Sequence, residues 1–167
     1  MDSGRTEWQA THEKDQSENW YRRITRSGLR CLYINAGSLV NKIDVFVALV
    51  QSQDYDVIII TETWLKEEIS SAEIQMQGYD IFRGDRQIRR RGGVVLIYTK
   101  AELNATVFTP KMKFPEQAWC RISNNLSADL HIGVCYRLDN KQLYHDDSHC
   151  ILTELITEMS SNFFCLI

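Results

Sequence analysis

Two polar side chains follow apolar segments early in the sequence. Glu62 comes directly after the apolar run DVIIIT, and Asn35 ends the segment LRCLYIN. A carboxylate at the carboxyl end of a buried strand suits Mg²⁺, which takes few protein oxygens and completes its shell with water and substrate phosphate. A cation held there could polarise a phosphoryl oxygen. Glu62 is therefore a candidate metal ligand, although its spacing alone favours an ordinary solvent-facing glutamate after a strand.

Three further side chains could bind a phosphate. The amide of Asn35 can donate to a phosphate or to the carboxylate without adding charge, and Tyr136 and Arg137 end the apolar segment DLHIGVCYR. A phenol can hydrogen-bond a phosphate oxygen, and a guanidinium can form a bidentate pair with one. Asn35 and Tyr136 also have plainer interpretations, as a turn residue and as a packed ring with its hydroxyl in water.

One segment is strongly basic. RGDRQIRRRGG, residues 83–93, holds five arginines and one aspartate. The net charge of the whole chain is only −3, so any contact with a polyanion must come from such a local patch. The patch would contact backbone phosphates without reading sequence, although its composition also fits a solvated connection between strands. The candidate phosphate-binding residues are Arg83, Arg86, Arg89, Arg90 and Arg91.

The elements that must position Asn35 and Glu62 are a strand, a helix and a strand. Residues 29–35 are predicted to form a short buried strand, and residues 56–61 a strand covered on both faces. Between them, Ser38 is expected to cap a helix with apolar residues at helical spacing. Those apolar residues are Leu39, Ile43, Phe46, Val47 and Val50. Such a crossover places the two strands parallel in one sheet, so we predict that Asn35 and Glu62 lie side by side at one edge.

The later sequence alternates short apolar segments with turn residues. This pattern predicts a run of strands, one in each of the segments GYDIFRGD, GGVVLIYTK, LNATVFTP, EQAWCRIS and DLHIGVCYR. A second helix is expected within residues 141–160. The final segment NFFCLI is expected to begin another buried strand.

Length and composition are those of one globular domain. The chain has 167 residues and 44% hydrophobic content, enough for a core of its own. We expect the domain to span residues 29–167 and the polar segment 1–28 to be a disordered tail. No signal-peptide pattern and no apolar run of about 20 residues is present. We therefore expect an intracellular protein of the nucleus or cytoplasm that is not secreted and contacts no membrane.

The cysteines and histidines indicate neither a disulfide framework nor a zinc site. The five cysteines are odd in number and include no C-x-x-C pair. The four histidines form no ligand spacing with the cysteines or with each other. We expect no disulfide-linked partner.

Four segments, taken in order, resemble the first half of an endonuclease/exonuclease/phosphatase domain, with particular similarity to the endonuclease domains of non-LTR (LINE-type) retrotransposons. They are LYINAGSLVNKIDVF, DVIIITETWL, GYDIFRGDRQIRRRGGVVLIYTK and HIGVCYR. The resemblance covers about residues 29–167 and implies an α/β (α+β) fold, a DNase I-like β-sandwich flanked by helices and incomplete at the C-terminus. It also implies cleavage of DNA phosphodiester bonds with Mg²⁺ or Mn²⁺. In a full-length parent element, a reverse transcriptase domain would be expected as well.

The resemblance also implies roles for individual residues. Asn35 matches the asparagine of the first motif, Glu62 the metal-ligating glutamate, Tyr136 the active-site tyrosine and Arg137 the arginine that often follows it. The later Gly-Asp-Phe-Asn and Ser-Asp-His motifs of the family are absent from this sequence. Their absence implies weak metal binding and little or no activity. Two alternatives therefore stay open: an inert nucleic-acid or protein binding fragment, and a phosphoesterase that acts on small-molecule or lipid phosphoesters.

Overall fold

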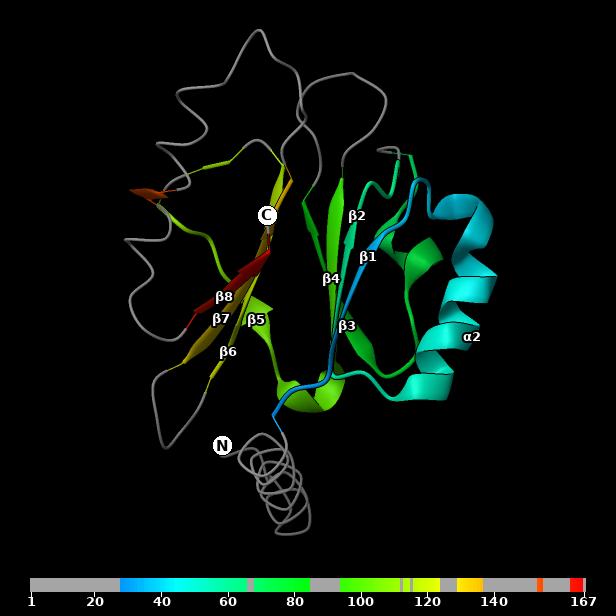
Figure 1. Cartoon of the computed structure of the whole chain (residues 1–167), viewed down its shortest axis with the longest axis horizontal. Helices are drawn as coiled ribbons and strands as arrows, with labels where there is room; N and C mark the ends of the chain where they lie inside the picture. The colour runs from blue at the N-terminus through cyan, green and yellow to red at the C-terminus, as the bar shows by residue number, and fades with distance from the viewer. Residues whose placement is uncertain are drawn as a thin grey trace, which may run out of the picture.

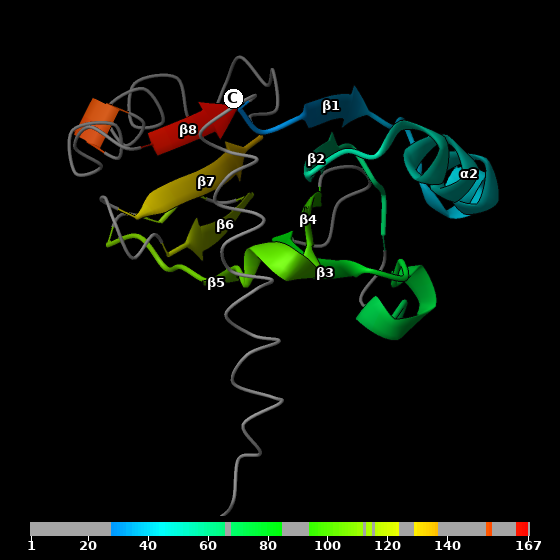
Figure 2. The same ribbon diagram turned by 90° about the horizontal axis from the view of Figure 1, so that it is seen from below.

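The computed structural model describes residues 28–65, 68–84, 94–111, 113–114, 116–123, 129–136, 153–154 and the backbone of 163–166. Within these residues, two four-stranded β-sheets lie face to face, and one α-helix covers the outer face of the first sheet (Figure 1, Figure 2). The expected α/β sandwich is confirmed. The predicted tail lies outside the described residues except for Gly28. Of the predicted helix within 141–160, only Thr153 and Glu154 are described, and both are helical.

The first sheet has the strand order β1-β2-β4-β3. Its strands are β1 (Cys31–Asn35), β2 (Val57–Thr61), β3 (Tyr79–Gly84) and β4 (Val95–Lys100). β1 and β2 run parallel with Asn35 opposite Thr61, and β4 is antiparallel to both β2 and β3. Every residue of β2 is buried, as expected for a β-branched run covered on both faces. The predicted parallel crossover is confirmed, but the prediction that its first strand is buried is wrong, because β1 is an edge strand whose residues alternate between exposed and half-buried.

The second sheet has the strand order β5-β6-β7-β8. Its strands are β5 (Thr106–Val107), β6 (Gln117–Ile122), β7 (Leu130–Cys135) and β8 (Phe163–Leu166). β5, β6 and β7 are antiparallel neighbours, whereas β8 is parallel to β7. Each strand lies within a segment where the apolar pattern predicts one, including the last.

Helix α2 (Ile43–Gln53) follows the short 3-10 helix η1 (Val40–Lys42) and packs on the first sheet. The predicted Ser38 cap is wrong. Ser38 has a left-handed φ of 87°, whereas a capping residue needs an extended backbone, and no side chain caps η1 or α2. The predicted apolar face is confirmed, because all five of its residues belong to or pack against one hydrophobic cluster with the outer face of the sheet.

The space between the sheets is filled by alternate residues of their strands. Successive side chains of a strand point to opposite faces of its sheet. Each central strand therefore contributes side chains both to this inner core and to the outer face of its own sheet. The inner core includes Val57, Ile59, Val95 and Ile97 from the first sheet and Cys120, Ile122, Ile132 and Val134 from the second. Two further 3-10 helices, η2 (Ser71–Ile74) and η3 (Ala101–Leu103), follow β2 and β4.

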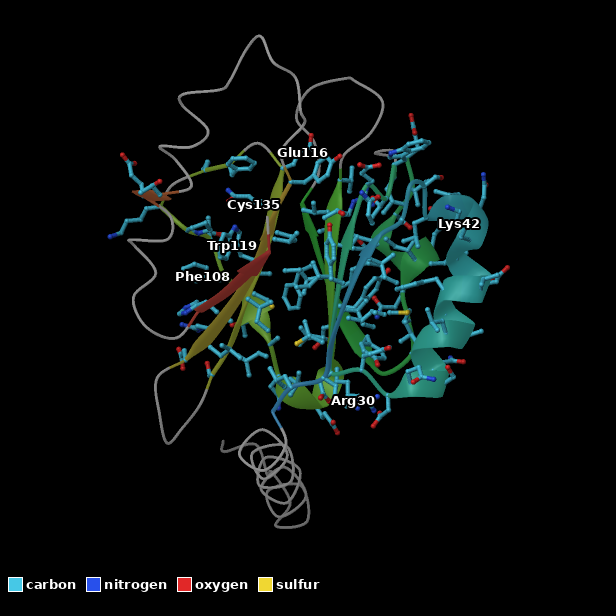
Figure 3. All side chains as sticks on the ribbon, in the orientation of Figure 1. Arg30, Lys42, Phe108, Glu116, Trp119 and Cys135 are labelled. Carbon is cyan, nitrogen blue, oxygen red and sulfur yellow. The ribbon has the colours of Figure 1, made fainter. Side chains whose placement is uncertain are left out.

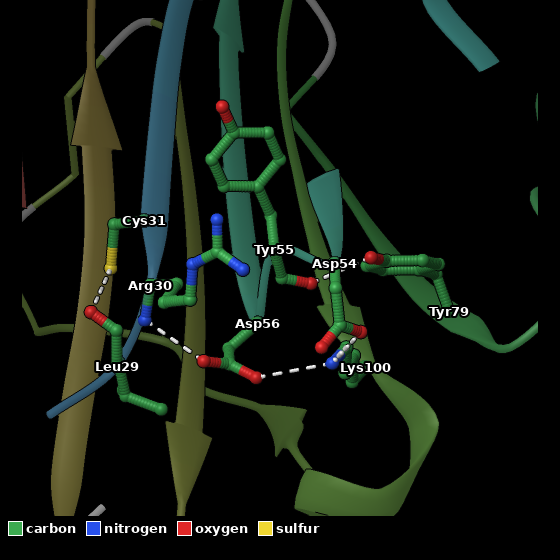
Figure 4. A network of polar contacts seen from close by, with 8 residues as sticks. All are labelled: Leu29, Arg30, Cys31, Asp54, Tyr55, Asp56, Tyr79 and Lys100. Carbon is green, nitrogen blue, oxygen red and sulfur yellow. Dashed lines mark hydrogen bonds and ion pairs between the residues drawn. The ribbon is translucent and has the colours of Figure 1, made fainter. Parts of the chain in front are cut away.

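A buried acid joins three strands of the first sheet at the end where β1 begins (Figure 4). The carboxylate of Asp56 accepts the backbone N–H of Arg30 at 2.8 Å and lies 3.3 Å from the ammonium of Lys100. Lys100 also pairs with the exposed Asp54 at 2.5 Å. This network holds β1 in register against β2, and the register fixes the position of Asn35 relative to Glu62.

The described cysteines Cys31, Cys120 and Cys135 are free thiols and form no disulfide. Burial raises the pKa of the Cys120 thiol to about 12. Among the helices of the described part of the chain, none is long and apolar enough to cross a bilayer.

Candidate active site

Three strands end at one rim of the sandwich and carry the three predicted catalytic residues. Asn35 is the last residue of β1, Glu62 follows β2, and Tyr136 follows β7. Because Asn35 lies opposite Thr61, its side chain reaches Glu62 and forms a hydrogen bond with the carboxylate. The predicted proximity of Asn35 and Glu62 is therefore confirmed. Tyr136 joins them from the second sheet, since its hydroxyl donates to Oε1 of Glu62.

The carboxylate of Glu62 is held in its ionised form. Hydrogen bonds from Tyr136 and then from Asn35 lower its pKa below the ordinary value, and a smaller effect of burial opposes them. Oδ1 of Asn35 accepts the backbone N–H of Gly37 at 3.3 Å, which leaves the amide nitrogen to donate to Glu62. The site thus presents a partly buried, oriented and charged carboxylate at neutral pH.

Tyr136 is kept in its protonated form by the same surroundings. Burial, the hydrogen bond to Glu62 and the negative charge of Glu62 raise its pKa to about 12, with smaller effects of Glu116 and Tyr33. A phenol with this pKa is neutral at physiological pH and can act as a hydrogen-bond donor. The hydroxyl of Tyr33 itself lies 3.1 Å from Oγ1 of Thr61.

The backbone around Glu62 is strained and held from two sides. Glu62 has a left-handed φ of 51°, a conformation that costs free energy for a residue with a side chain. On one side, Ser38 N–H donates to the carbonyl of Glu62 at 2.9 Å. On the other, both the backbone N–H and the hydroxyl of Thr63 donate to the carbonyl of Val94, at 3.3 and 3.1 Å. These bonds hold the carboxylate at the rim.

Glu116 is a rim residue that the sequence reasoning did not single out. It is buried and immediately precedes β6, and its carbonyl accepts the backbone N–H of Tyr136 at 2.9 Å. Figure 3 shows Glu116 and Arg30 at opposite ends of the sandwich. A signal was present, because the first residue of one antiparallel strand lies beside the last residue of its neighbour.

Of the arginines predicted to bind phosphate, only Arg83 lies within the described residues. The guanidinium of Arg83 donates to the carbonyl of Ile69 at 2.5 Å. Burial raises the pKa of Tyr98, and the positive charge of Arg83 partly opposes this effect. The other candidates, Arg86, Arg89, Arg90, Arg91 and Arg137, lie outside the described residues. Of the residues that flank 85–93, Gly84 packs on the start of β6, where a Cβ would lie 1.9 Å from the carbonyl oxygen of Gln117. Val94 contacts Thr63, so both flanking residues lie at the rim.

Glu62 has the donor chemistry that Mg²⁺ requires. An ionised carboxylate is an oxygen ligand, and Mg²⁺ often uses one or two carboxylates and completes its shell with water and phosphate. The described residues include no group of three or more His, Cys, Asp or Glu that could hold a metal ion. Glu62 therefore fits as a single carboxylate ligand, and binding through it alone is expected to be weak.

Solved structures resemble the chain, whereas no protein-family model and no curated protein sequence matches it. The 3′ phosphatase NExo from Neisseria bound to a product DNA hairpin has a TM-score of 0.59 at 16% identity, covering 83% of this chain and 56% of that one. The endonuclease domain of TRAS1, a telomere-specific non-LTR retrotransposon, has 0.61 at 10% identity, covering 82% and 58%. TDP2 of D. rerio complexed with single-strand DNA product has 0.54 at 12% identity, with the same coverage of 82% and 58%.

These likenesses define the class of fold. The chain has a DNase I-like α/β fold, as the resemblance of its segments implied. It spans a little more than half the length of each of these structures, 56% to 58%.

Proposed function

We propose that the rim site cleaves phosphodiester bonds of DNA with Mg²⁺ or Mn²⁺, with at most weak activity in this chain, whose sequence lacks the Gly-Asp-Phe-Asn and Ser-Asp-His motifs. The observation that supports this function best is the hydrogen-bonded cluster of Asn35, Glu62 and Tyr136, formed by residues from three strands of two sheets. Its location at the carboxyl ends of β1, β2 and β7 agrees with the roles that the family resemblance implies. The similar fold of NExo, TRAS1 and TDP2 supports a nucleic-acid substrate.

Each residue of the cluster has a distinct proposed role. Glu62, ionised at neutral pH, would bind the divalent cation, which when bound stabilises negative charge on phosphoryl oxygens. Asn35 orients the carboxylate through its amide without adding charge. Tyr136 keeps its proton at neutral pH and can donate it in a hydrogen bond to a non-bridging phosphate oxygen, which would position the scissile phosphate.

The finer assignment is to a retrotransposon-type endonuclease. It rests on the ordered motifs of the sequence and on the likeness to the TRAS1 domain. On this proposal, the parent element would also encode a reverse transcriptase domain, and the protein would act on chromosomal DNA inside the cell. The arginines of residues 83–93, together with Arg137, would add contacts to backbone phosphates that weaken as salt concentration rises.

A plasmid-nicking assay tests the catalytic proposal. Supercoiled plasmid is incubated with the chain and Mg²⁺ or Mn²⁺ at several millimolar, because weak cation binding is expected. Glu62→Gln should slow nicking more than about 100-fold. Loss of a residue that only orients a metal ligand costs about 10- to 100-fold, and loss of the ligand itself should cost more. Glu102→Gln is the matched control, because Glu102 is an exposed acid in η3 at the other end of the first sheet.

Two results would replace the proposal by an alternative. Salt-sensitive DNA binding without nicking at any cation concentration would identify a non-catalytic binding fragment. Release of phosphate from a small phosphoester by wild-type chain but not by Glu62→Gln, with plasmid intact, would identify a phosphoesterase for other substrates. Addition of EDTA should abolish nicking, and nicking that continues in EDTA would contradict the role of the cation.

A further inference from the structure

Trp64 exposes a large aromatic surface beside the proposed catalytic residues. Half of the surface of this residue, 50%, is open to solvent. Its two neighbours in the chain, Thr63 and Leu65, are both buried. Burial of Thr63 and Leu65 fixes the backbone on both sides of Trp64 and so keeps its indole exposed. Tryptophan is enriched at contact surfaces, because its ring is apolar and its N–H can hydrogen-bond.

The backbone of Trp64 is held in an unfavourable conformation. Its φ is 55°, in the left-handed region, which is uncommon for a bulky residue and persists only where surrounding contacts enforce it. The neighbouring Thr63 supplies these contacts, because it is bound twice to the carbonyl of Val94 and its own carbonyl accepts the N–H of Leu39 at 2.8 Å. Strained residues of this kind cluster at binding and catalytic sites.

The backbone of Trp64 lies close to that of Glu62. Two residues of chain span at most about 7 Å, and Trp64 lies two residues after Glu62. A nucleotide whose phosphate lies at Glu62 can therefore bring its own base, or the base next to it, to the indole. Stacking of a base on an aromatic ring tolerates any sequence, because every base has a π-face. It requires that the face is exposed, as in single-stranded or locally unpaired nucleic acid.

We propose that Trp64 stacks on an unpaired base of a nucleic acid whose phosphate lies at Glu62, so that the site prefers single-stranded or locally unpaired DNA over intact duplex. The inference rests on the proposed function and adds the form of its substrate. It assigns Trp64 to substrate binding, beside a site whose chemistry depends on Glu62. The likeness to TDP2 complexed with single-strand DNA product is compatible with such a substrate.

Binding of fluorescently labelled oligonucleotides tests the inference without catalysis. Fluorescence anisotropy is measured with Ca²⁺ in place of Mg²⁺, so that a cation can still join Glu62 to the phosphate, for a single strand and for the matching blunt duplex, with wild-type chain, Trp64→Ala and Trp64→Phe. Loss of one stacked base should weaken single-strand binding roughly 10-fold or more in Trp64→Ala, and less in Trp64→Phe, because a phenyl ring still stacks. Duplex binding should change less than about 2-fold. Val45→Ala is the matched control, since Val45 is a 75% exposed apolar residue on α2.

A second measurement reports stacking directly. The tryptophan emission of the wild-type chain should be quenched when the single strand binds, and the quenching should be largely lost in Trp64→Phe. Thermal unfolding by circular dichroism checks that both variants remain folded, which we expect because the indole is half exposed. Quenching that is undiminished in a folded Trp64→Phe would overturn the inference.

Three binding results would also overturn the inference: equal weakening of single strand and duplex, no weakening of either, or no binding of single strands by the wild-type chain. The proposed function fails on a different measurement. If Glu62→Gln nicks plasmid as fast as wild type while Trp64→Ala loses single-strand binding, the catalytic proposal is wrong and the stacking role stands. If Glu62→Gln is inactive while Trp64→Ala binds normally, the catalytic proposal stands and the stacking role is wrong.

Discussion

The hydroxyl of Tyr136 donates a hydrogen bond to Oε1 of Glu62, although 74 positions of sequence separate the two residues. The bond joins the two sheets, because Glu62 follows β2 and Tyr136 follows β7. It is the largest cause of the lowered pKa of Glu62, and it contributes to the raised pKa of Tyr136. Its removal should therefore change both proton binding and stability.

Tyr136→Phe should destabilise the protein more at neutral pH than in acid. Because the pKa of Glu62 is lowered on folding, the stabilisation is present above the unfolded pKa of about 4.3 and is lost as pH falls through the folded pKa. At pH 7 we expect the free energy of unfolding to fall by about 1 kcal/mol, a low figure for a hydrogen bond to a charged group because Glu62 is partly exposed. Urea unfolding in EDTA at pH 7 and pH 3 measures the difference. Equal losses at both pH values would contradict this origin of the effect.

Tyr136 should ionise about two pH units later than an exposed tyrosine. Its pKa of about 12 lies above the ordinary value of about 10. Since the folded pKa is the higher one, the associated stability is present below pH 10 and is lost as pH rises from about 10 to 12. The difference between alkaline absorbance titrations of wild type and Tyr136→Phe at 295 nm isolates this group. A midpoint near 10 in that difference curve would show that Glu62 and burial do not act on the phenol.

Asp56→Ala should be far more destabilising than Asp54→Ala, although both acids pair with Lys100 (Figure 4). The side chain of Asp56 is 2% exposed and that of Asp54 is 61% exposed. Breaking a buried pair costs about 3 to 5 kcal/mol, whereas an exposed pair contributes about 0 to 1 kcal/mol. Chemical denaturation of the two variants gives both values. A cost for Asp54→Ala as large as that for Asp56→Ala would mean that the shorter ion pair, and not the buried one, holds the strands.

Gly133→Ala should destabilise the second sheet through a direct clash. A Cβ on Gly133 would lie 2.1 Å from ring carbons of Trp119, and that ring is buried and packed edge-on to Phe108. We expect a loss of about 1 to 3 kcal/mol, as for other overpacked cores. A double-mutant cycle with Trp119→Phe checks the cause, because a smaller ring should relieve part of the added cost. Strictly additive losses would place the strain elsewhere.

Most strands of the fold could be predicted from local patterns. The apolar run of β2 and the alternating segments of β3, β4, β6 and β7 carry their own signals, because burial of one or both faces requires a defined apolar period. The start of the helix could not be predicted from residue type. Ser38 is a good capping residue in general, but the bond from its N–H to Glu62 holds it in a left-handed conformation that excludes capping.

The candidate site also combines features that could be predicted from the sequence with features that could not. The juxtaposition of Asn35 and Glu62 follows from a short crossover between parallel strands, which is a local rule. Tyr136 entered the sequence analysis only as a residue at a strand end, and only its family resemblance assigned it to the same site. Glu116 and Trp64 were not assigned to it at all, because neither the burial of one nor the exposure of the other can be read from their immediate neighbours.

By itself, the sequence determined the order of the elements, the parallel pairing of β1 with β2 and the delivery of an amide and an acid to one rim. These depend on apolar periodicity and on crossovers between elements that are neighbours in sequence. Only the tertiary structure decided that the end of β7 lies at that same rim, within hydrogen-bonding distance of Glu62. The physical reason is that the stacking of two sheets is set by the packing of their shared core, whose residues come from distant parts of the chain.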